Sequence, residues 1–116
     1  MAEAHKKIVD QFAQSLNAGH LNELDKFCEH YVEKIAEHNV VYKNIDEARD
    51  YHAKLRQTYP SSEWKILEYQ HDDPYNETLV ARLSYNNQTY HTTYTFSSAG
   101  KIEKIHSVPE HHHHTY

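Results

Sequence analysis

The sequence has little of what would place it in a specialised class of protein. It holds one cysteine, Cys28, among 116 residues, which excludes a disulfide within the chain and favours a reducing compartment. It contains no long apolar run and no apolar segment near its start, so neither a membrane span nor a secretion signal is expected. We therefore expect a cytoplasmic protein without a membrane partner.

Positive charge is also scarce. Twelve Lys and Arg residues face 17 Asp and Glu residues, for a net charge of −5, whereas a nucleic-acid surface needs clustered cations. The run of histidines at residues 111–114 could bind a transition metal, but no regular spacing with cysteine or carboxylate makes a closed zinc site. We expect no nucleic-acid partner, no metal site and no cofactor, and we interpret residues 111–116 as a disordered tail.

Only two glycines are present, and each lies where a positive φ would be useful. Gly19 follows an apolar periodic run and predicts a helix end. Gly100 lies between two segments of alternating side chains and predicts a turn between strands. The length fits one domain, over residues 1–110. The order of these two signals predicts helices first and an antiparallel sheet last.

The first half of the chain has helical periodicity. Apolar residues recur on one stripe in residues 4–18 and again in residues 21–28. Asn44 and Glu47 have the spacing of a capping box and predict a third helix. Pro60 ends that helix near Thr58 or Tyr59. Residues 31–43 predict one or two short strands.

After Pro60 the period changes to two, which predicts strands over residues 63–71, 77–85, 88–97 and 101–108. Asn86 and Asn87 suit a two-residue hairpin turn, because asparagine tolerates positive φ. Such a turn pairs Leu79 with Tyr94, Ala81 with Thr92 and Leu83 with Tyr90. One face then collects aliphatic and phenolic side chains, and we expect that face to meet the helices.

The last strand leaves one question open. Ile102 and Ile105 have opposite parity, so either one of them faces away from the core or a bulge lies between them. The direction of His106 depends on which alternative holds.

Four segments, residues 12–21, 37–39, 59–61 and 100–102, resemble in order the "LNAGDL", "HNP", "FPD" and "DGKI" motifs of SnoaL-like polyketide cyclases and ketosteroid isomerases. These groups belong to the nuclear transport factor 2-like superfamily. The resemblance implies an α+β fold in which a cone-shaped, curved, mostly antiparallel sheet wraps around three helices of the N-terminal half. It also implies a cavity for a small hydrophobic molecule and a homodimer.

The catalytic residues of these groups transfer poorly. Phe12 stands where the isomerases have an oxyanion-hole tyrosine, His38 where they have a general-base aspartate, and Thr92 where they have a protonated aspartate. Cyclases use a carboxylate near the end of the last strand, where Glu110 lies. Steroid isomerase activity is therefore not expected, and whether the chain is an enzyme stays open.

His38 is the candidate for acid/base catalysis, since it would lie at the cavity mouth and imidazole titrates near neutral pH. The alternative is that it only bonds loop backbone. Candidate ligand-binding residues are Phe12, His52, Trp64, Tyr90, Thr92, Tyr94 and His106. The alternative for most of them is a place in the core. Candidate dimer-interface residues are Arg82, His91 and Thr93, and the alternative is an ordinary exposed face.

Two functions follow from these alternatives. The first is binding of a small molecule, without catalysis or with an activity not yet assigned. The second is an acid/base isomerase, cyclase or hydrolase acting on a small hydrophobic substrate. A cavity that brings His38, His52 or Glu110 within hydrogen-bonding reach of one another would favour the enzyme. A cavity filled by Trp64, Tyr90 and Tyr94 would favour a binding or structural role.

Overall fold

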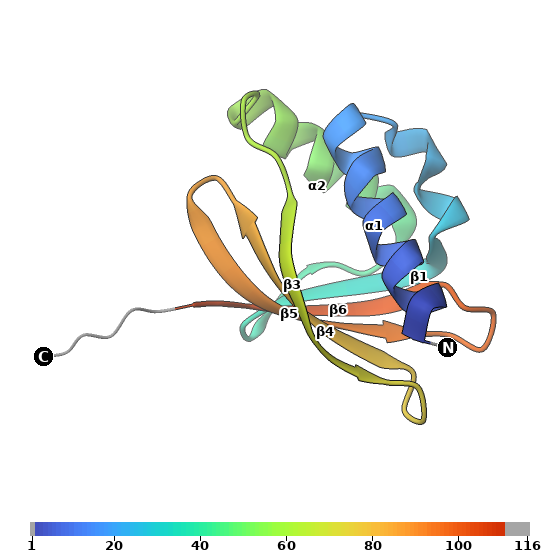
Figure 1. Cartoon of the computed structure of the whole chain (residues 1–116). Helices are drawn as coiled ribbons and strands as arrows, with labels where there is room; N and C mark the ends of the chain where they lie inside the picture. The colour runs from blue at the N-terminus through green and yellow to red at the C-terminus, as the bar shows by residue number, and fades with distance from the viewer. Residues whose placement is uncertain (1, 111–116) are drawn as a thin grey trace, which may run out of the picture.

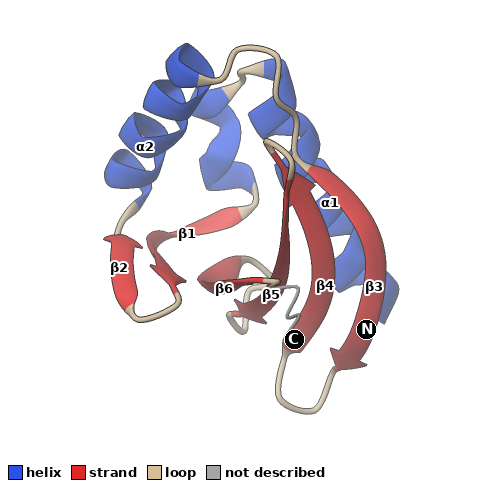
Figure 2. Cartoon of the chain, turned by 90° about the vertical axis from the view of Figure 1, so that its left-hand side faces the viewer, coloured by secondary structure: helices blue, strands red, loops and turns tan. Residues whose placement is uncertain are grey.

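In the computed structural model, which describes residues 2–110, a curved six-stranded sheet carries all of the helices on its concave side (Figure 1). Figure 2 shows how strongly the strands curl around the helical layer. The elements are α1 (Ala2–Ala18), the 3-10 helix η1 (Leu21–Lys26), β1 (Cys28–Ala36), β2 (Asn39–Tyr42), α2 (Ile45–Thr58), β3 (Lys65–Asp73), β4 (Thr78–Tyr85), β5 (Gln88–Phe96) and β6 (Ile102–Pro109).

The sheet has the order β2-β1-β6-β5-β4-β3. Only β1 and β6 run parallel, and the other neighbours are antiparallel. The predicted fold class, a curved and mostly antiparallel sheet with the helices in the N-terminal half, is confirmed. No helix within residues 2–110 is long and apolar enough to cross a membrane. The tail predicted for residues 111–116 lies outside the described residues.

The β4–β5 hairpin has the predicted register. Leu83 is opposite Tyr90 and Ala81 is opposite Thr92, and the two turn residues, Asn86 and Asn87, have φ values of 51° and 67°. Burial alternates strictly along β4, so every second side chain points toward the helices. The face of aliphatic and phenolic side chains is the one that meets the helical layer.

Gly19 ends α1 as predicted. At φ 79° it allows His20 N to donate to Ser15 O at 2.9 Å and its own N–H to donate to Leu16 O at 3.2 Å, a Schellman arrangement. Arg56 of α2 completes the cap, because its Nη1 donates to Leu16 O at 3.1 Å. The end of α1 is thereby fixed against α2 above the sheet.

The second helix differs from the prediction. It is a 3-10 helix that ends at Lys26, and Cys28 already begins β1. His20 provides no side-chain bond to cap it, and a short segment without a cap does not hold an α-helix. The third helix agrees with the prediction, since Glu47 N donates to Asn44 Oδ1 at 2.9 Å and the helix ends at Thr58.

The open question about β6 is settled by a bulge. Lys104 is opposite Thr95 while Ile102 is opposite Phe96, so Glu103 is the extra residue. Both Ile102 and Ile105 are buried as a result.

Candidate functional site

A cavity lies between the concave face of the sheet and helices α1 and α2. The space between its walls amounts to about 420 Å3, part of it open to solvent, but it is narrow enough to hold only about one or two water molecules. Most of its walls are aliphatic or aromatic. The lining residues are Phe12, Ala13, Leu16, Lys34, Tyr42, His52, Trp64, Ile66, Leu83, Thr92, Tyr94, Ile105 and Ser107.

The single cation of this cavity is Lys34, which the sequence analysis did not select. Val32 and Lys34 share the inward face of β1 by strand alternation, and Lys34 is only 7% exposed. Its Nζ lies 4.8 Å from the ring centroid of Trp64 and 5.4 Å from that of Tyr51. Within residues 2–110 no carboxylate forms an ion pair with it. Burial lowers the pKa of the Lys34 ammonium group to about 8.

His52 extends from α2 into the same cavity. It is 3% exposed, and its Nε2 has no hydrogen-bond partner. Edge-on aromatic contacts surround its ring, with centroids 5.9 Å from Trp64 and 6.1 Å from Tyr42. Burial, and secondly the charge of Lys34, lower the pKa of His52 to about 3. The imidazole is therefore neutral at physiological pH.

Thr92 of β5 provides a third polar group. It is 1% exposed, and its Oγ1 also has no hydrogen-bond partner. The hairpin register places it opposite Ala81 and opposite Ser107 of β6, on the wall that faces α1 and α2. A buried polar group without a partner costs about 1–3 kcal/mol, so the unpaired His52 Nε2 and Thr92 Oγ1 each lower the stability of the fold.

A second hollow continues outward from the cavity. Lys34, Trp64 and Ser107 line both spaces and so separate the inner cavity from the outer hollow. The other walls of the outer hollow are mainly aromatic and amide side chains: Ala36, Tyr51, Leu55, Tyr59, Tyr85, Asn86, Gln88 and Tyr90. Lys34 therefore lies at the boundary between the inner cavity and the outer hollow.

The structure brings most of the predicted ligand-binding residues to these two spaces. Five of them line the inner cavity, and they are Phe12, His52, Trp64, Thr92 and Tyr94. Tyr90 lines the outer hollow.

His106 does not reach either space. The bulge at Glu103 turns Ile105 and Ser107 toward the cavity, so His106 points to the other face, opposite Thr93. There its Nε2 donates to Glu37 O at 3.0 Å. The direction of His106, which the sequence leaves open, is thus away from the cavity, and its candidacy as a ligand-binding residue is wrong.

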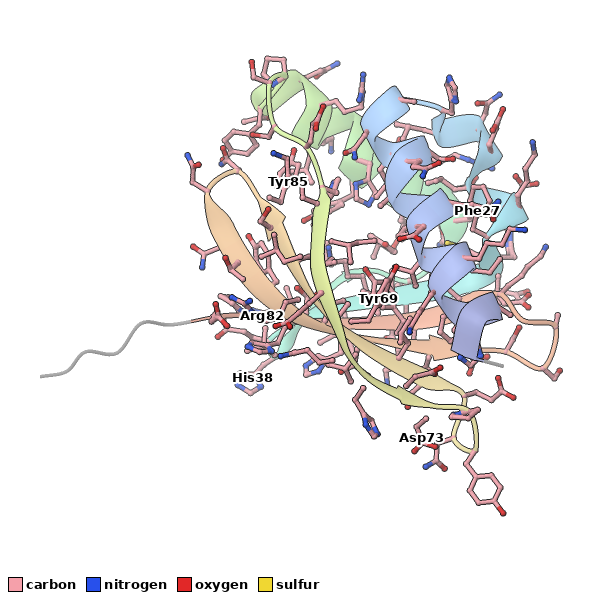
Figure 3. All side chains as sticks on the ribbon, in the orientation of Figure 1. Phe27, His38, Tyr69, Asp73, Arg82 and Tyr85 are labelled. Atoms are coloured by element: carbon pink, nitrogen blue, oxygen red, sulfur yellow. The ribbon has the colours of Figure 1, made fainter. Side chains whose placement is uncertain are left out.

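His38 is also placed away from the cavity. It is exposed in the turn between β1 and β2, and Figure 3 shows it on the side of the sheet remote from the helices. The expected position at the cavity mouth is wrong, because the β1–β2 turn bends outward. One sequence signal could have indicated that Lys34 is buried: it lies two residues after the apolar Val32, so both side chains point to the same face of the strand. A lysine next to Glu33, however, is more typical of a solvent-exposed strand.

The outer face of the sheet carries a separate group of charges. Arg82 donates to Glu110 Oε1 at 2.9 Å and to Glu68 Oε2 at 3.3 Å, and His91 Nε2 lies 2.9 Å from Glu110 Oε2. Arg82 and His91 are cross-strand neighbours, as the hairpin register predicts, and Figure 3 shows Arg82 on this side. The bonds from Arg82 and His91 lower the pKa of Glu110. Glu110 is thus held on the face opposite the cavity.

Metal binding has no support in the described part of the chain. Within residues 2–110 no three His, Cys, Asp or Glu side chains form a group that could hold an ion. The histidines at residues 111–114 lie outside the described residues.

Solved structures with the same architecture are numerous. A SnoaL-like polyketide cyclase from Agrobacterium tumefaciens is similar at a TM-score of 0.74 and 20% identity, covering 91% of each chain. A protein of unknown function with a cystatin-like fold, from Methylobium petroleophilum, reaches a TM-score of 0.85 at 10% identity and covers 98% of this chain and 80% of its own. A SnoaL-like protein of unknown function from Burkholderia thailandensis reaches 0.81 at 7% identity, covering 96% and 98%.

These similarities establish the fold: the chain has the cone-shaped α+β fold of SnoaL-like proteins. By sequence, no known family profile matches the chain. No curated protein matches it either. Because one fold of this kind can host unrelated functions, the function must be argued from the cavity.

Proposed function

We propose that this protein binds a small, mainly apolar molecule in the space between its sheet and its helices. One observation carries the proposal: a largely aromatic cavity holds the buried Lys34 side chain, which has no ion pair within residues 2–110, and two buried atoms with no hydrogen-bond partner among those residues, His52 Nε2 and Thr92 Oγ1. Apolar walls with a few convergent polar groups are typical of ligand sites. A ligand that bonds these groups would offset what their burial costs the fold.

Binding without carboxylate-based catalysis has better support than the acid/base enzyme. His38, His52 and Glu110 are not brought together: His52 lies inside, His38 in an exposed turn, and Glu110 beside Arg82 on the outer face. Neither space is lined by an Asp or Glu side chain. The enzyme stays as an alternative because the Lys34 amine lines both spaces and burial lowers its pKa to about 8, so it could transfer a proton.

Native mass spectrometry of the purified protein tests the proposal by detecting bound small molecules. Two variants of β6 make this test more specific. Ser107→Leu places a leucine side chain between the inner cavity and the outer hollow, while His106→Leu places the same side chain on the opposite face of the sheet. Ligand retained by His106→Leu and lost by Ser107→Leu is the expected result. Ligand retained equally by both variants would place the site elsewhere. Ligand leaving with an altered mass would favour the enzyme.

We also propose a homodimer formed through the outer sheet face, with Arg82, His91 and Thr93 in the interface. All of the helices described lie on the other side of the sheet (Figure 1), which leaves this face available to a second copy. Its half-buried side chains alternate with the core residues of β4 and β5.

The single cysteine, Cys28, is buried and unpaired, in keeping with the cytoplasmic location proposed here.

A further inference from the structure

The interior of the protein has a charge opposite to that of the whole chain. The chain carries 17 acidic residues and a net charge of −5. Yet, among the described residues, the inner cavity and the outer hollow together are lined by one cation, Lys34, and by no carboxylate. A cleft lined by one sign of charge between low-dielectric walls attracts the opposite sign.

The polar groups of the inner cavity can all donate hydrogen bonds. Lys34 has an ammonium group with three N–H bonds, Thr92 has a hydroxyl, and His52 donates whenever its proton lies on Nε2. Within residues 2–110, Thr92 Oγ1 and His52 Nε2 have no hydrogen-bond partner, and Lys34 Nζ lies over two aromatic rings without an ion pair. The site therefore presents donors to which the described chain supplies no acceptor.

We propose that the ligand is a small monoanion, a carboxylate with an aromatic or alicyclic body, whose oxygens accept from Lys34 Nζ and Thr92 Oγ1. This inference rests on the proposed function and names its substrate class. The body of the ligand lies in the outer hollow against Trp64, Tyr85 and Tyr90, since Lys34 and Trp64 line both spaces. Its carboxylate points inward.

A carboxylate fits better than the other anions. A phosphate monoester carries nearly two charges at neutral pH, and only one cation is present to meet them. A neutral ligand would leave the ammonium group as it is, whereas a carboxylate would form a charge-assisted bond in a site largely closed to water. His52 adds a neutral N–H donor there and no second charge, because its lowered pKa keeps it uncharged.

The test compares two molecules of nearly equal shape, phenylacetate and phenylacetamide. Trp64 is the only tryptophan of the chain and lines both spaces, so its fluorescence and calorimetric titration report binding. Native protein should bind phenylacetate at least about tenfold more tightly than phenylacetamide, a difference of about 1.4 kcal/mol. Lys34→Met should bind both molecules equally. Lys104→Met, which removes an exposed lysine from the same sheet, should keep the difference.

The pH dependence provides a second readout. The inner cavity contains three further titratable groups, Tyr42, His52 and Tyr94. Tyr51 of α2 also packs against Lys34. Burial raises the pKa of all three tyrosines and lowers that of His52 to about 3, so among these groups only Lys34 changes charge near pH 8. Affinity for phenylacetate should be nearly constant from about pH 6, where the carboxyl group is ionised, to just below pH 8 and fall above it, while affinity for phenylacetamide stays level.

The outcomes separate the two proposals. Equal affinity of native protein for both molecules overturns the anionic ligand and leaves the cavity as a binding site. A carbonyl compound fixed to Lys34 by borohydride, with no preference for phenylacetate, also overturns it, because the amine would then be a nucleophile. If neither molecule binds and native mass spectrometry finds no ligand, both the anion and the proposed function are wrong.

Discussion

Lys34 and Arg82 lie on opposite faces of the same sheet and have opposite electrostatic surroundings. Arg82 is bonded to Glu110 and Glu68, and these bonds raise the pKa of its guanidinium group. The Lys34 ammonium group lies over two aromatic rings with no ion pair among the described residues, and burial lowers its pKa to about 8. The outer cation is neutralised by the chain itself, whereas the inner one is not. This contrast supports the proposal that the inner face is the ligand site.

The largest expected effect is a gain of stability when the inner cation is removed. Lys34→Met should raise the free energy of unfolding at pH 7 by about 2–3 kcal/mol, because the folded state holds the charge at a pKa of about 8 instead of 10.5. Loss of the cation–π contacts offsets part of this gain. Arg82→Met, the matched change on the outer face, should lower stability by less than about 1 kcal/mol. Urea unfolding measures both values.

A destabilised Lys34→Met protein would contradict the comparison. Lys34 would then stabilise the fold, because its contacts with the aromatic rings would contribute more free energy than the desolvation of its charge costs. The two cations would in that case differ only in the kind of partner they have.

The same difference predicts a pH dependence. Between pH 8 and pH 10.5 the unfolded chain keeps the Lys34 proton that the folded chain has released. The unfolded state therefore binds more protons, and the stability of native protein rises with pH across this window relative to Lys34→Met. The gap between native protein and the variant should nearly close by pH 10.5. A gap that is constant with pH would show that the charge is not the cause.

His52 gives a similar effect on the acid side. Its pKa is about 3 in the folded chain against 6.5 when exposed, so the unfolded state gains the proton first as the pH falls through 6.5. Native protein should lose about 2 kcal/mol relative to His52→Gln between pH 7 and pH 5. Parallel stability curves for the two proteins, measured by thermal unfolding at each pH, would show that His52 is not isolated from solvent.

The sequence predicted the elements that depend on local signals. The paired asparagines determined the β4–β5 register, Gly19 the end of α1, and Asn44 the start of α2. The face of the sheet to which each side chain points was predictable wherever side chains alternate without a bulge. The bulge at Glu103 broke this alternation and reversed His106.

Lys34 was missed for a different reason. Side chains on the buried face of a strand are usually apolar, so a lysine is not expected there. Only the packing of Trp64 and Tyr51, which come from distant segments, shows that Lys34 is buried. His38 was misplaced because motif resemblance places a residue along the chain but not the direction in which its turn bends. The sequence thus predicted most of the side chains that line the candidate site but not the buried lysine that gives the site its charge.

The smallest effect on stability is expected on the outer face, at the proposed dimer contact. Thr93→Arg adds a charge beside His106 on that face and should shift sedimentation velocity from dimer to monomer. Its free energy of unfolding should change by less than about 0.5 kcal/mol. Glu103→Arg, an exposed change in β6, is the control. An unchanged sedimentation profile for Thr93→Arg would remove this face as the interface.

The most direct measurement is an NMR titration of Lys34 itself, with the signal assigned by its loss in Lys34→Met. The ligand-free protein should show a pKa of about 8 for this lysine, and saturating phenylacetate should raise it, because a bound carboxylate favours the charged amine. A value near 10.5 in the free protein, unmoved by phenylacetate, would contradict the account. It would show that the ammonium group is solvated or already paired.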